Sequence, residues 1–290
     1  LAEHGEMKAA GAVALTDDGR PVVDSRLMRR AMEYATSHGL LIMSHAEEVS
    51  LSRGGCMNEG EISTRLGLRG IPAAAESIMV YREIALAELT GARVHISHVS
   101  SEQSLALIRN AKARGVKVTA ETAPHYFTLT EKAVLGYNTH AKMSPPLRTE
   151  KDLQAIRIAL QDGTLDAIAT DHAPHSILQK EVEFNLAANG VVGLETSLSL
   201  SLALVREGVI SPNRLVELMS CAPAVILGVA GGTLRIGGVA DVTVINPQKR
   251  FSFSAEKSFS LGKNSPFDGW DLQGKAVLTI LAGRITHCDL

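Results

Sequence analysis

Four short apolar runs, each ending on a residue type that binds metals, place the strongest constraint on how this chain can fold. They span residues 12–18, 40–45, 93–98 and 165–171. Each has the length of a β-strand, and helix-like segments alternate with them, which indicates a parallel sheet. A (β/α)8 barrel places its functional residues at the C-terminal ends of its strands. Carboxylates and imidazoles without cysteine favour zinc, manganese or iron held for hydrolysis. We therefore predict an α/β fold, a TIM-type (β/α)8 barrel with a metal-hydrolase site.

The composition argues against several other classes of protein. The chain has 290 residues, of which 45% are hydrophobic and 21% charged, enough for one large domain and a small one. Its net charge of −2, without a basic run, argues against nucleic acid as a partner. No apolar stretch approaches the roughly 18 residues of a membrane helix. Three widely spaced cysteines are typical of reduced thiols in a cytoplasmic protein.

Helix signals lie between the strands. We predict helices over residues 25–38, 73–89, 100–114 and 149–160, then near 193–206 and 212–219. Asp24 should cap the first, and Ser100 to Gln103 should form a capping box at the third. The segment 54–60 is expected to be a long loop, and loops of that length inside a domain are often functional.

The pattern changes near residue 231. We predict a partial catalytic barrel over residues 1–230 and a small β-sandwich segment over 231–290, with a hairpin at Ala282-Gly283. Five βα units precede that boundary, whereas a closed barrel needs eight. We therefore expect these to be strands 4–8, with three further units before Leu1. The 290-residue chain alone is expected to be inactive.

The segment from Asp171 to His175 is the sharpest local signal of chemistry. Asp171 ends a strand, and Pro174 turns the chain over the mouth of the predicted barrel. A carboxylate there can bind a metal and also transfer a proton. The alternative is an aspartate that caps a helix, with two surface histidines.

The other strand ends supply further candidates. His45 and His98 end neighbouring strands and are predicted metal ligands, whereas His95 is expected to be structural. Of Asp17 and Asp18, one carboxylate could bridge two metals, or the pair could form a plain turn. A role for His125 in the site and a structural role both remain open.

Ten motifs, spread almost from end to end, carry a resemblance. They are Thr16-Asp-Asp-Gly19, Ser44-His-Ala-Glu-Glu48, Asn58-Glu-Gly60, Gly67-Leu-Arg-Gly-Ile-Pro72 with Glu76, His95-Ile-Ser-His-Val-Ser100, Glu121-Thr-Ala-Pro-His125, Pro145-Pro-Leu-Arg148, Thr170-Asp-His-Ala-Pro-His175, Gly190-Val-Val-Gly-Leu-Glu-Thr196 and Asn264-Ser-Pro-Phe-Asp-Gly269. In these motifs the chain resembles the class I dihydroorotases of the amidohydrolase superfamily. The family's His-x-His-x-Arg strand is not in this chain and is expected before Leu1.

The resemblance implies a role for each matching position. Asp18 corresponds to a metal-bridging carboxylate, His45 and His98 to ligands of one zinc, and Asp171 to a ligand of the other zinc and the catalytic acid/base. The substrate-binding positions are His175, which matches a residue that binds the substrate carboxylate, the backbone at Gly190, and Ser144. Ser144 stands where the family usually has asparagine, and hydantoinase-like enzymes also carry serine there. One or two Zn²⁺ ions per subunit are implied.

The implied activity is the reversible cyclisation of N-carbamoyl-L-aspartate to dihydroorotate in pyrimidine synthesis. A hydantoinase, dihydropyrimidinase or allantoinase is the first alternative; those enzymes commonly use a carboxylated lysine, and no lysine occupies position 17 or 18. A non-catalytic homologue that scaffolds aspartate carbamoyltransferase is the second. A homodimer and an association with that transferase both remain open.

Overall fold

The computed structural model describes residues 1–289 and contains the predicted parallel sheet. Its strands are β1 (Ala14–Thr16), β2 (Leu41–Ser44), β5 (Val94–Ile96), β6 (Val118–Thr122) and β7 (Ala167–Ile168). They pair in parallel, in the order β1-β2-β5-β6-β7. Neighbours in the sheet therefore follow the order of the chain, as consecutive βα units of a TIM-type barrel do.

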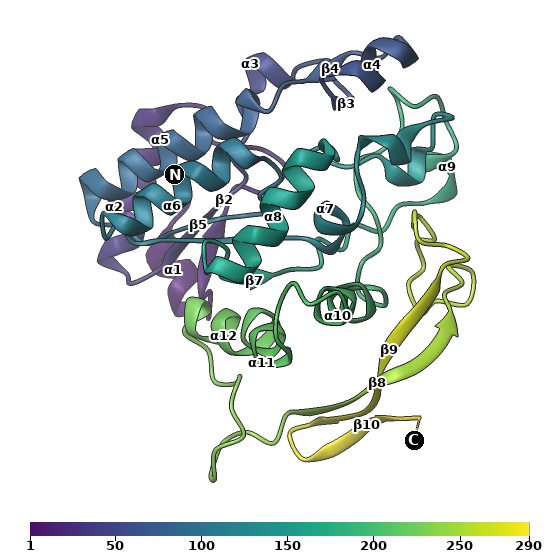
Figure 1. Cartoon of the computed structure of the whole chain (residues 1–290). Helices are drawn as coiled ribbons and strands as arrows, with labels where there is room; N and C mark the ends of the chain where they lie inside the picture. The colour runs from purple at the N-terminus through teal and green to yellow at the C-terminus, as the bar shows by residue number, and fades with distance from the viewer. Residues whose placement is uncertain (290) are drawn as a thin grey trace.

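Four helices connect these strands. They are α2 (Ser25–Ser37), α5 (Ala74–Thr90), α6 (Glu102–Ala113) and α8 (Glu150–Asp162). Each packs against the next, α2 on α5, α5 on α6 and α6 on α8, along one side of the sheet (Figure 1). Val94 and Ile96 of β5 are fully buried, with Ile108 and Ile156, in the core between sheet and helices. Apolar burial on this side is what holds the strand ends in place.

The helix ends confirm the predicted cap at Asp24, correct the one at Ser100 and show a further capping box at Thr149. Asp24 accepts a hydrogen bond from the amide of Leu27, and Thr149 forms a capping box with Asp152. The box predicted to start at Ser100 was wrong by one residue, since Ser101 is the N-cap and accepts from the amide of Ser104. Ser100 instead contacts a buried carboxylate described below, an acceptor that local sequence does not reveal.

Residues 54–60 were predicted as a long loop, but strand β3 lies within them, and other short elements flank them between β2 and α5. In chain order, these elements are α3 (Val49–Ser52), β3 (Met57–Asn58), α4 (Glu61–Leu66) and β4 (Gly70–Ile71). β3 and β4 pair in parallel, and the unit projects beyond the helices at the top of Figure 1. A Cβ at Gly70 would lie 2.4 Å from the Cα of Glu59, so only glycine allows this close approach.

The remaining elements surround the sheet. They are α1 (His4–Ala9), α7 (Pro124–Thr128), η1 (Glu131–Val134), η2 (Thr139–Ala141), α9 (Ile177–Lys180), α10 (Ser197–Arg206), α11 (Pro212–Val216), the π-helical η3 (Glu217–Cys221) and α12 (Ala222–Leu227). Pro212 stands at the first turn of α11 with Ser211 as its cap. Within residues 1–289, no helix combines the length and the apolar character needed to cross a membrane.

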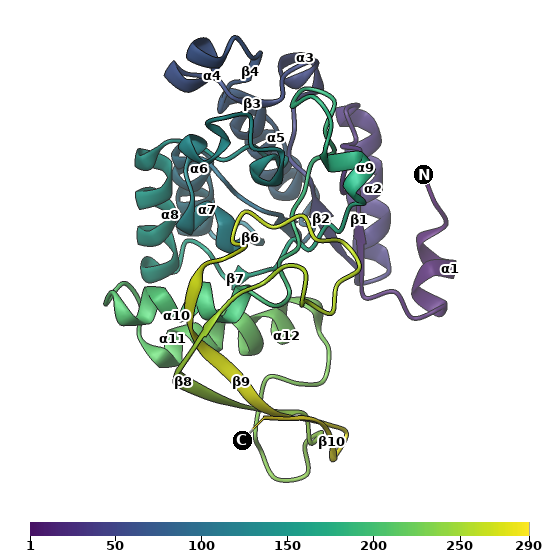
Figure 2. The ribbon, with the colours of Figure 1, turned by 90° about the vertical axis from the view of Figure 1, so that its right-hand side faces the viewer.

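An antiparallel sheet forms the C-terminal segment. Its strands are β8 (Val242–Ser252), β9 (Asp271–Leu281) and β10 (Arg284–Cys288), in the order β10-β9-β8. The predicted hairpin is confirmed, because Ala282 and Gly283 both have positive φ between β9 and β10. β9 packs against α10, where Ser199 donates to the carbonyl of Gly274 at 2.6 Å (Figure 2). The boundary at 230 and a second sandwich layer stay predictions.

Candidate metal centre

Three predicted ligands converge just beyond the C-terminal ends of adjacent strands. Asp18 follows β1, His45 follows β2 and His98 follows β5. His45 Nδ1 lies 2.9 Å from His98 Nε2, and Asp18 Oδ1 lies 3.4 Å and 3.3 Å from these two nitrogens. Both imidazoles are buried, whereas the carboxylate of Asp18 is largely exposed. Because parallel strands carry these residues to one edge, side chains 80 residues apart meet.

The donor set and its spacing fit a divalent metal ion. Zn–N bonds of about 2.0–2.1 Å in a tetrahedral arrangement separate neighbouring ligand atoms by roughly 3.3 Å. The two distances from Asp18 match that spacing, and the distance between the imidazole nitrogens is somewhat shorter. Among the described residues, these three form a group that could hold a metal ion. One ion could therefore contact all three with small side-chain adjustments.

A second carboxylate orients one of the imidazoles. Glu47 Oε2 lies 2.7 Å from His45 Nε2, the nitrogen that points away from the other two ligands. Carboxylates commonly hold metal-binding histidines in this way. Burial opposes a charged imidazole, but hydrogen bonds to Asp18 and Glu47 outweigh it and raise the pKa of His45 to about 9. The hydrogen bonds from His45 and His98 hold the pKa of Asp18 well below its ordinary value. A bound cation would replace the proton that His45 and Asp18 share in this hydrogen bond.

The structure separates the roles of the two adjacent aspartates. Asp17 accepts from the backbone amide of His45 at 2.8 Å and from that of Val22 at 2.8 Å. Its carboxylate therefore fixes the turn after β1 and the start of the segment after β2. Asp18 points to the imidazoles instead. The sequence left the choice between these two carboxylates open, and the tertiary contacts favour Asp18 as the ligand.

Asp171 lies outside the three-residue cluster and next to His125. Its Oδ2 is 3.7 Å from Nε2 of His125, a buried nitrogen with no hydrogen-bond partner within residues 1–289. Burial raises the pKa of Asp171 and lowers that of His125 to about 3, so His125 is neutral. Asp171 and His98 both have left-handed φ, 47° and 40°. Such conformations cost energy in non-glycine residues and cluster at functional sites.

Two other histidines have structural contacts. His95 Nδ1 lies 2.8 Å from the hydroxyl of Thr119, and its Nε2 lies 3.5 Å from Glu121. His172 Nδ1 accepts from the amide of Gly193 at 3.1 Å. Both ring nitrogens of His95 thus have polar neighbours, and Nδ1 of His172 is occupied. The expectation that His95 is structural therefore agrees with its hydrogen bonding.

The predicted substrate-binding residues lie on two loops. His175 Nε2 is 2.7 Å from the carbonyl oxygen of Asn189, the residue before Gly190, so these two candidates are brought together. Gly190 has φ +122°, and a Cβ there would lie 2.5 Å from Cβ of Ala173. Ser144 lies on the other loop, where it lines a small cavity with Glu47 and Arg148.

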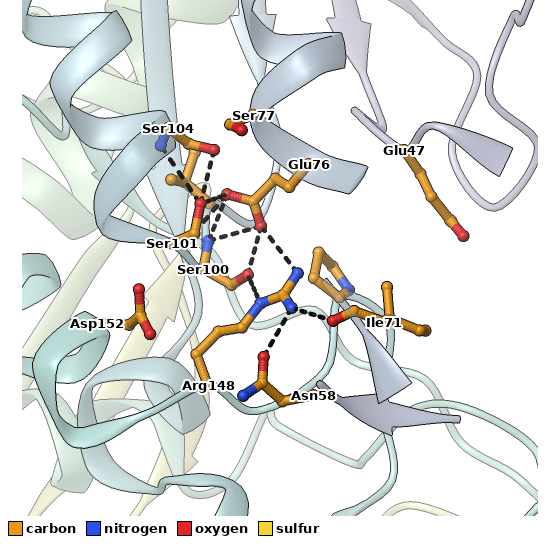
Figure 3. Close-up of polar contacts among 12 residues, drawn as sticks. Glu47, Asn58, Ile71, Glu76, Ser77, Ser100, Ser101, Ser104, Arg148 and Asp152 are labelled. Carbon is orange, nitrogen blue, oxygen red and sulfur yellow. Dashed lines mark hydrogen bonds and ion pairs between the residues drawn. The ribbon is translucent and has the colours of Figure 1, made fainter. Parts of the chain in front are cut away.

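A buried polar network, to which sequence reasoning gave no role, supports the loop after His98. Glu76 of α5 accepts from the amides and the hydroxyls of Ser100 and Ser101. Arg148 donates to the Ser100 hydroxyl at 3.1 Å and to Asn58 Oδ1 at 2.9 Å. Figure 3 shows the guanidinium between these partners. The only sequence signal was a glutamate on the apolar face of a helix, which is rarely buried without partners.

Comparison with known proteins agrees with this fold and site. A sequence profile of the amidohydrolase family matches residues 2–286, and the chain belongs to that family. Within it, the chain is 69% identical over 288 residues to a dihydroorotase of Desulfotalea psychrophila (strain LSv54 / DSM 12343). It is 60% identical over 287 residues to a dihydroorotase of Citrifermentans bemidjiense. Each match covers 99% of this chain and 68% of the relative.

Solved structures with the same fold are more distant in sequence. An L-hydantoinase (dihydropyrimidinase) from Arthrobacter aurescens has a TM-score of 0.86 at 28% identity over 98% of this chain. A dihydropyrimidinase from Brevibacillus agri NCHU1002 has a TM-score of 0.83 at 25% identity over 95% of it. The chain spans 66% and 63% of the lengths of these two proteins.

Proposed function

We propose that this chain carries the catalytic centre of a zinc-dependent dihydroorotase. The reaction is the reversible cyclisation of N-carbamoyl-L-aspartate to dihydroorotate, a step of de novo pyrimidine biosynthesis. The observation that carries the proposal is the convergence of Asp18, His45 and His98 at adjacent strand ends. The substrate class is supported by 69% identity to a dihydroorotase over 99% of the chain.

The cluster would hold the metal through neutral imidazoles and one carboxylate. A divalent ion bound there would lower the pKa of a water molecule and polarise the carbonyl under attack. We propose one or two zinc ions per subunit, because zinc accepts mixed nitrogen and oxygen ligands in open sites. In this proposal Asp18 would serve as the bridging carboxylate, and His45 and His98 would be ligands of one ion. Glu47 keeps the imidazole of His45 oriented.

Asp171 would act as the proton carrier. In the hydrolytic direction it accepts a proton from the attacking water and returns it to the ring nitrogen as the carbon–nitrogen bond breaks. In the cyclising direction the same carboxyl moves the proton the other way. Burial raises the pKa of Asp171, which brings it closer to the operating pH of a general acid/base. The adjacent neutral His125 does not compete for a proton at pH 7, since its pKa is about 3.

The substrate would bind between the two loops beyond the strand ends. His175 would face the substrate carboxylate, and backbone groups near Gly190 would pair with ring amide groups. Ser144 would contribute one hydroxyl where an asparagine would offer a donor and an acceptor group. These assignments place the recognition groups on loops and the ligands on strand ends, as in other barrel enzymes.

Two other functions fit less well. The hydantoinase and dihydropyrimidinase structures are only 28% and 25% identical to this chain. A carboxylated lysine would need a lysine where Asp17 and Asp18 stand. A scaffold without catalysis would have no need for three converging ligand atoms. A homodimer, binding of aspartate carbamoyltransferase and a cytoplasmic location stay predictions.

The proposal is tested with protein expressed from its complete natural reading frame. Turnover is measured with carbamoyl-aspartate, dihydroorotate, hydantoin and allantoin, and bound metal is quantified by elemental analysis. We expect about one or two zinc ions per subunit and conversion of the first two compounds only. Turnover of hydantoin in preference to dihydroorotate would overturn the substrate assignment, and bound zinc without any turnover would favour the scaffold.

A further inference from the structure

The backbone of Gly190 is fixed from three sides by residues that are not metal ligands. Its amide donates to the carbonyl oxygen of Lys142 at 2.9 Å. Its carbonyl oxygen accepts from Lys180 Nζ at 3.1 Å and from Asn264 Nδ2 at 3.0 Å. Both lone pairs of this carbonyl are therefore used, and the peptide plane has a single defined orientation.

Lys180 is a buried ammonium with an uncommon set of partners. The side chain is 1% exposed, and Nζ donates to the carbonyls of Lys142 at 3.3 Å, Ala188 at 2.8 Å and Gly190 at 3.1 Å. The three N–H groups of the ammonium thus meet three carbonyl acceptors, and within residues 1–289 no carboxylate pairs with Lys180. Burying a charge is costly, and an apolar side chain here would often be at least as stabilising. Simple stability therefore does not account for a lysine at this position.

Asn264 connects the segment that contains Gly190 to the segment that carries His175. It is 1% exposed, and its Oδ1 accepts from the amide of His175 at 2.9 Å. Its Nδ2 donates to the carbonyls of Ala173 at 2.9 Å and Gly190 at 3.0 Å. Its own carbonyl accepts from the amide of Val192 at 3.0 Å. One side chain from beyond β8 thus fixes the segment at Gly190 against the segment that carries His175.

We propose that Lys180 and Asn264 are positioning residues that anchor the segment around Gly190 and, with it, His175 in their substrate-binding geometry. This inference rests on the proposed function, in which those two groups hold the substrate. Neither positioning residue contacts Asp18, His45, His98 or Asp171 among the described hydrogen bonds. Their loss should therefore weaken substrate binding and raise KM, while metal content stays unchanged.

The protonation of Lys180 provides a readout that a purely structural role would not give. Burial, with the like charge of Lys142 nearby, lowers the pKa of Lys180 to about 8. A neutral amine has two donors and a lone pair, so one of the three carbonyls would lose its partner. KM should therefore rise as pH increases through about 8. The other titratable groups facing this region are His140, whose own pKa the Lys180 charge helps to lower, Glu181 and His175.

The experiment measures KM, kcat and bound metal from pH 6.5 to pH 9.5 in protein from the complete natural reading frame. Lys180→Met should raise KM at neutral pH by about tenfold or more and remove the alkaline rise. Asn264→Asp keeps the acceptor for His175 but loses both donors, and it should also raise KM. Lys142→Met removes the neighbouring charge, so the alkaline rise should move to higher pH. Lys151→Met, on an exposed side chain, serves as the matched control.

The outcomes separate this inference from the proposed function. A wild-type enzyme without dihydroorotate turnover would defeat the proposed function. If the wild type is active but its KM does not change between pH 7 and 9.5, the positioning role alone is overturned. An unchanged KM in Asn264→Asp would have the same consequence. If Lys180→Met does not fold, the role of Lys180 is tested by comparing the pH dependence of KM in the wild type and in Lys142→Met. An alkaline rise that stays at the same pH in Lys142→Met would assign it to another group and overturn the role of Lys180.

Discussion

Arg148 Nη1 donates to Oδ1 of Asn58 at 2.9 Å, across 90 residues of sequence. The same nitrogen donates to the carbonyl of Ile71 at 2.8 Å, so one guanidinium holds both β3 and β4. Its Nε reaches Ser100, two residues beyond the ligand His98. The loop that carries Ser144, the β3–β4 unit and the segment after β5 are therefore joined at one buried point (Figure 3).

Removal of this guanidinium should destabilise the whole fold. Arg148→Met would remove the buried donor to Asn58 Oδ1 and to the carbonyl of Ile71, and it would leave the buried carboxylate of Glu76 without its countercharge. We expect the free energy of unfolding to fall by about 3–5 kcal/mol, measured by urea denaturation. Arg109→Met is the control, because its pair with Asp162 is exposed and should contribute about 0–1 kcal/mol. Equal losses in the two variants would contradict the role of the network.

Asp171→Ala should abolish turnover. Without the carboxyl, no side chain would carry the proton between water and the ring nitrogen, and we expect kcat to fall by about 10²–10⁴-fold. Asp271→Ala, on an exposed position of β9, is the control and should retain activity. Near-normal turnover by Asp171→Ala would refute the assignment of the proton carrier.

Metal binding should depend on the ligands and, to a smaller degree, on Glu47. His98→Ala should lose bound metal on dialysis, because one of three converging donor atoms is removed. Glu47→Gln should weaken metal affinity by about 10–100-fold, since the amide no longer accepts strongly from His45. Zinc content and competition with a chelator measure both effects. A Glu47→Gln variant with unchanged affinity would show that the carboxylate does not orient the imidazole.

Gly190→Ala should impair substrate binding. The added Cβ would lie 2.5 Å from Cβ of Ala173, and φ is +122°. We expect a rise in KM with little change in bound zinc. Gly115→Ala is the matched control, because its φ is +79° but nothing lies within 4 Å of the new Cβ. It should cost about 1–2 kcal/mol of stability and leave KM unchanged. A normal KM in Gly190→Ala would argue against a substrate contact there.

Local sequence signals were sufficient for the parallel sheet and most of the candidate site. Apolar runs, caps and glycine stops predicted β1, β2, β5 and β7 in their correct places. Because parallel strands end at one edge, the same signals predicted that His45, His98 and one of the two aspartates after β1 would lie close together. Strand periodicity and strand order are properties of neighbouring residues, and a sequence displays them directly.

Only the tertiary structure decided between groups that look alike in sequence. Asp17 and Asp18 are chemically identical, and they differ because Asp17 meets two backbone amides. The polar partners of Glu76 and Lys180 come from other loops, so no local pattern revealed them. Asn264 and Gly190 are 74 residues apart. The sequence by itself determined which residues end the strands, whereas packing of distant loops determined which polar groups position the site, since those hydrogen bonds exist only after the chain has folded.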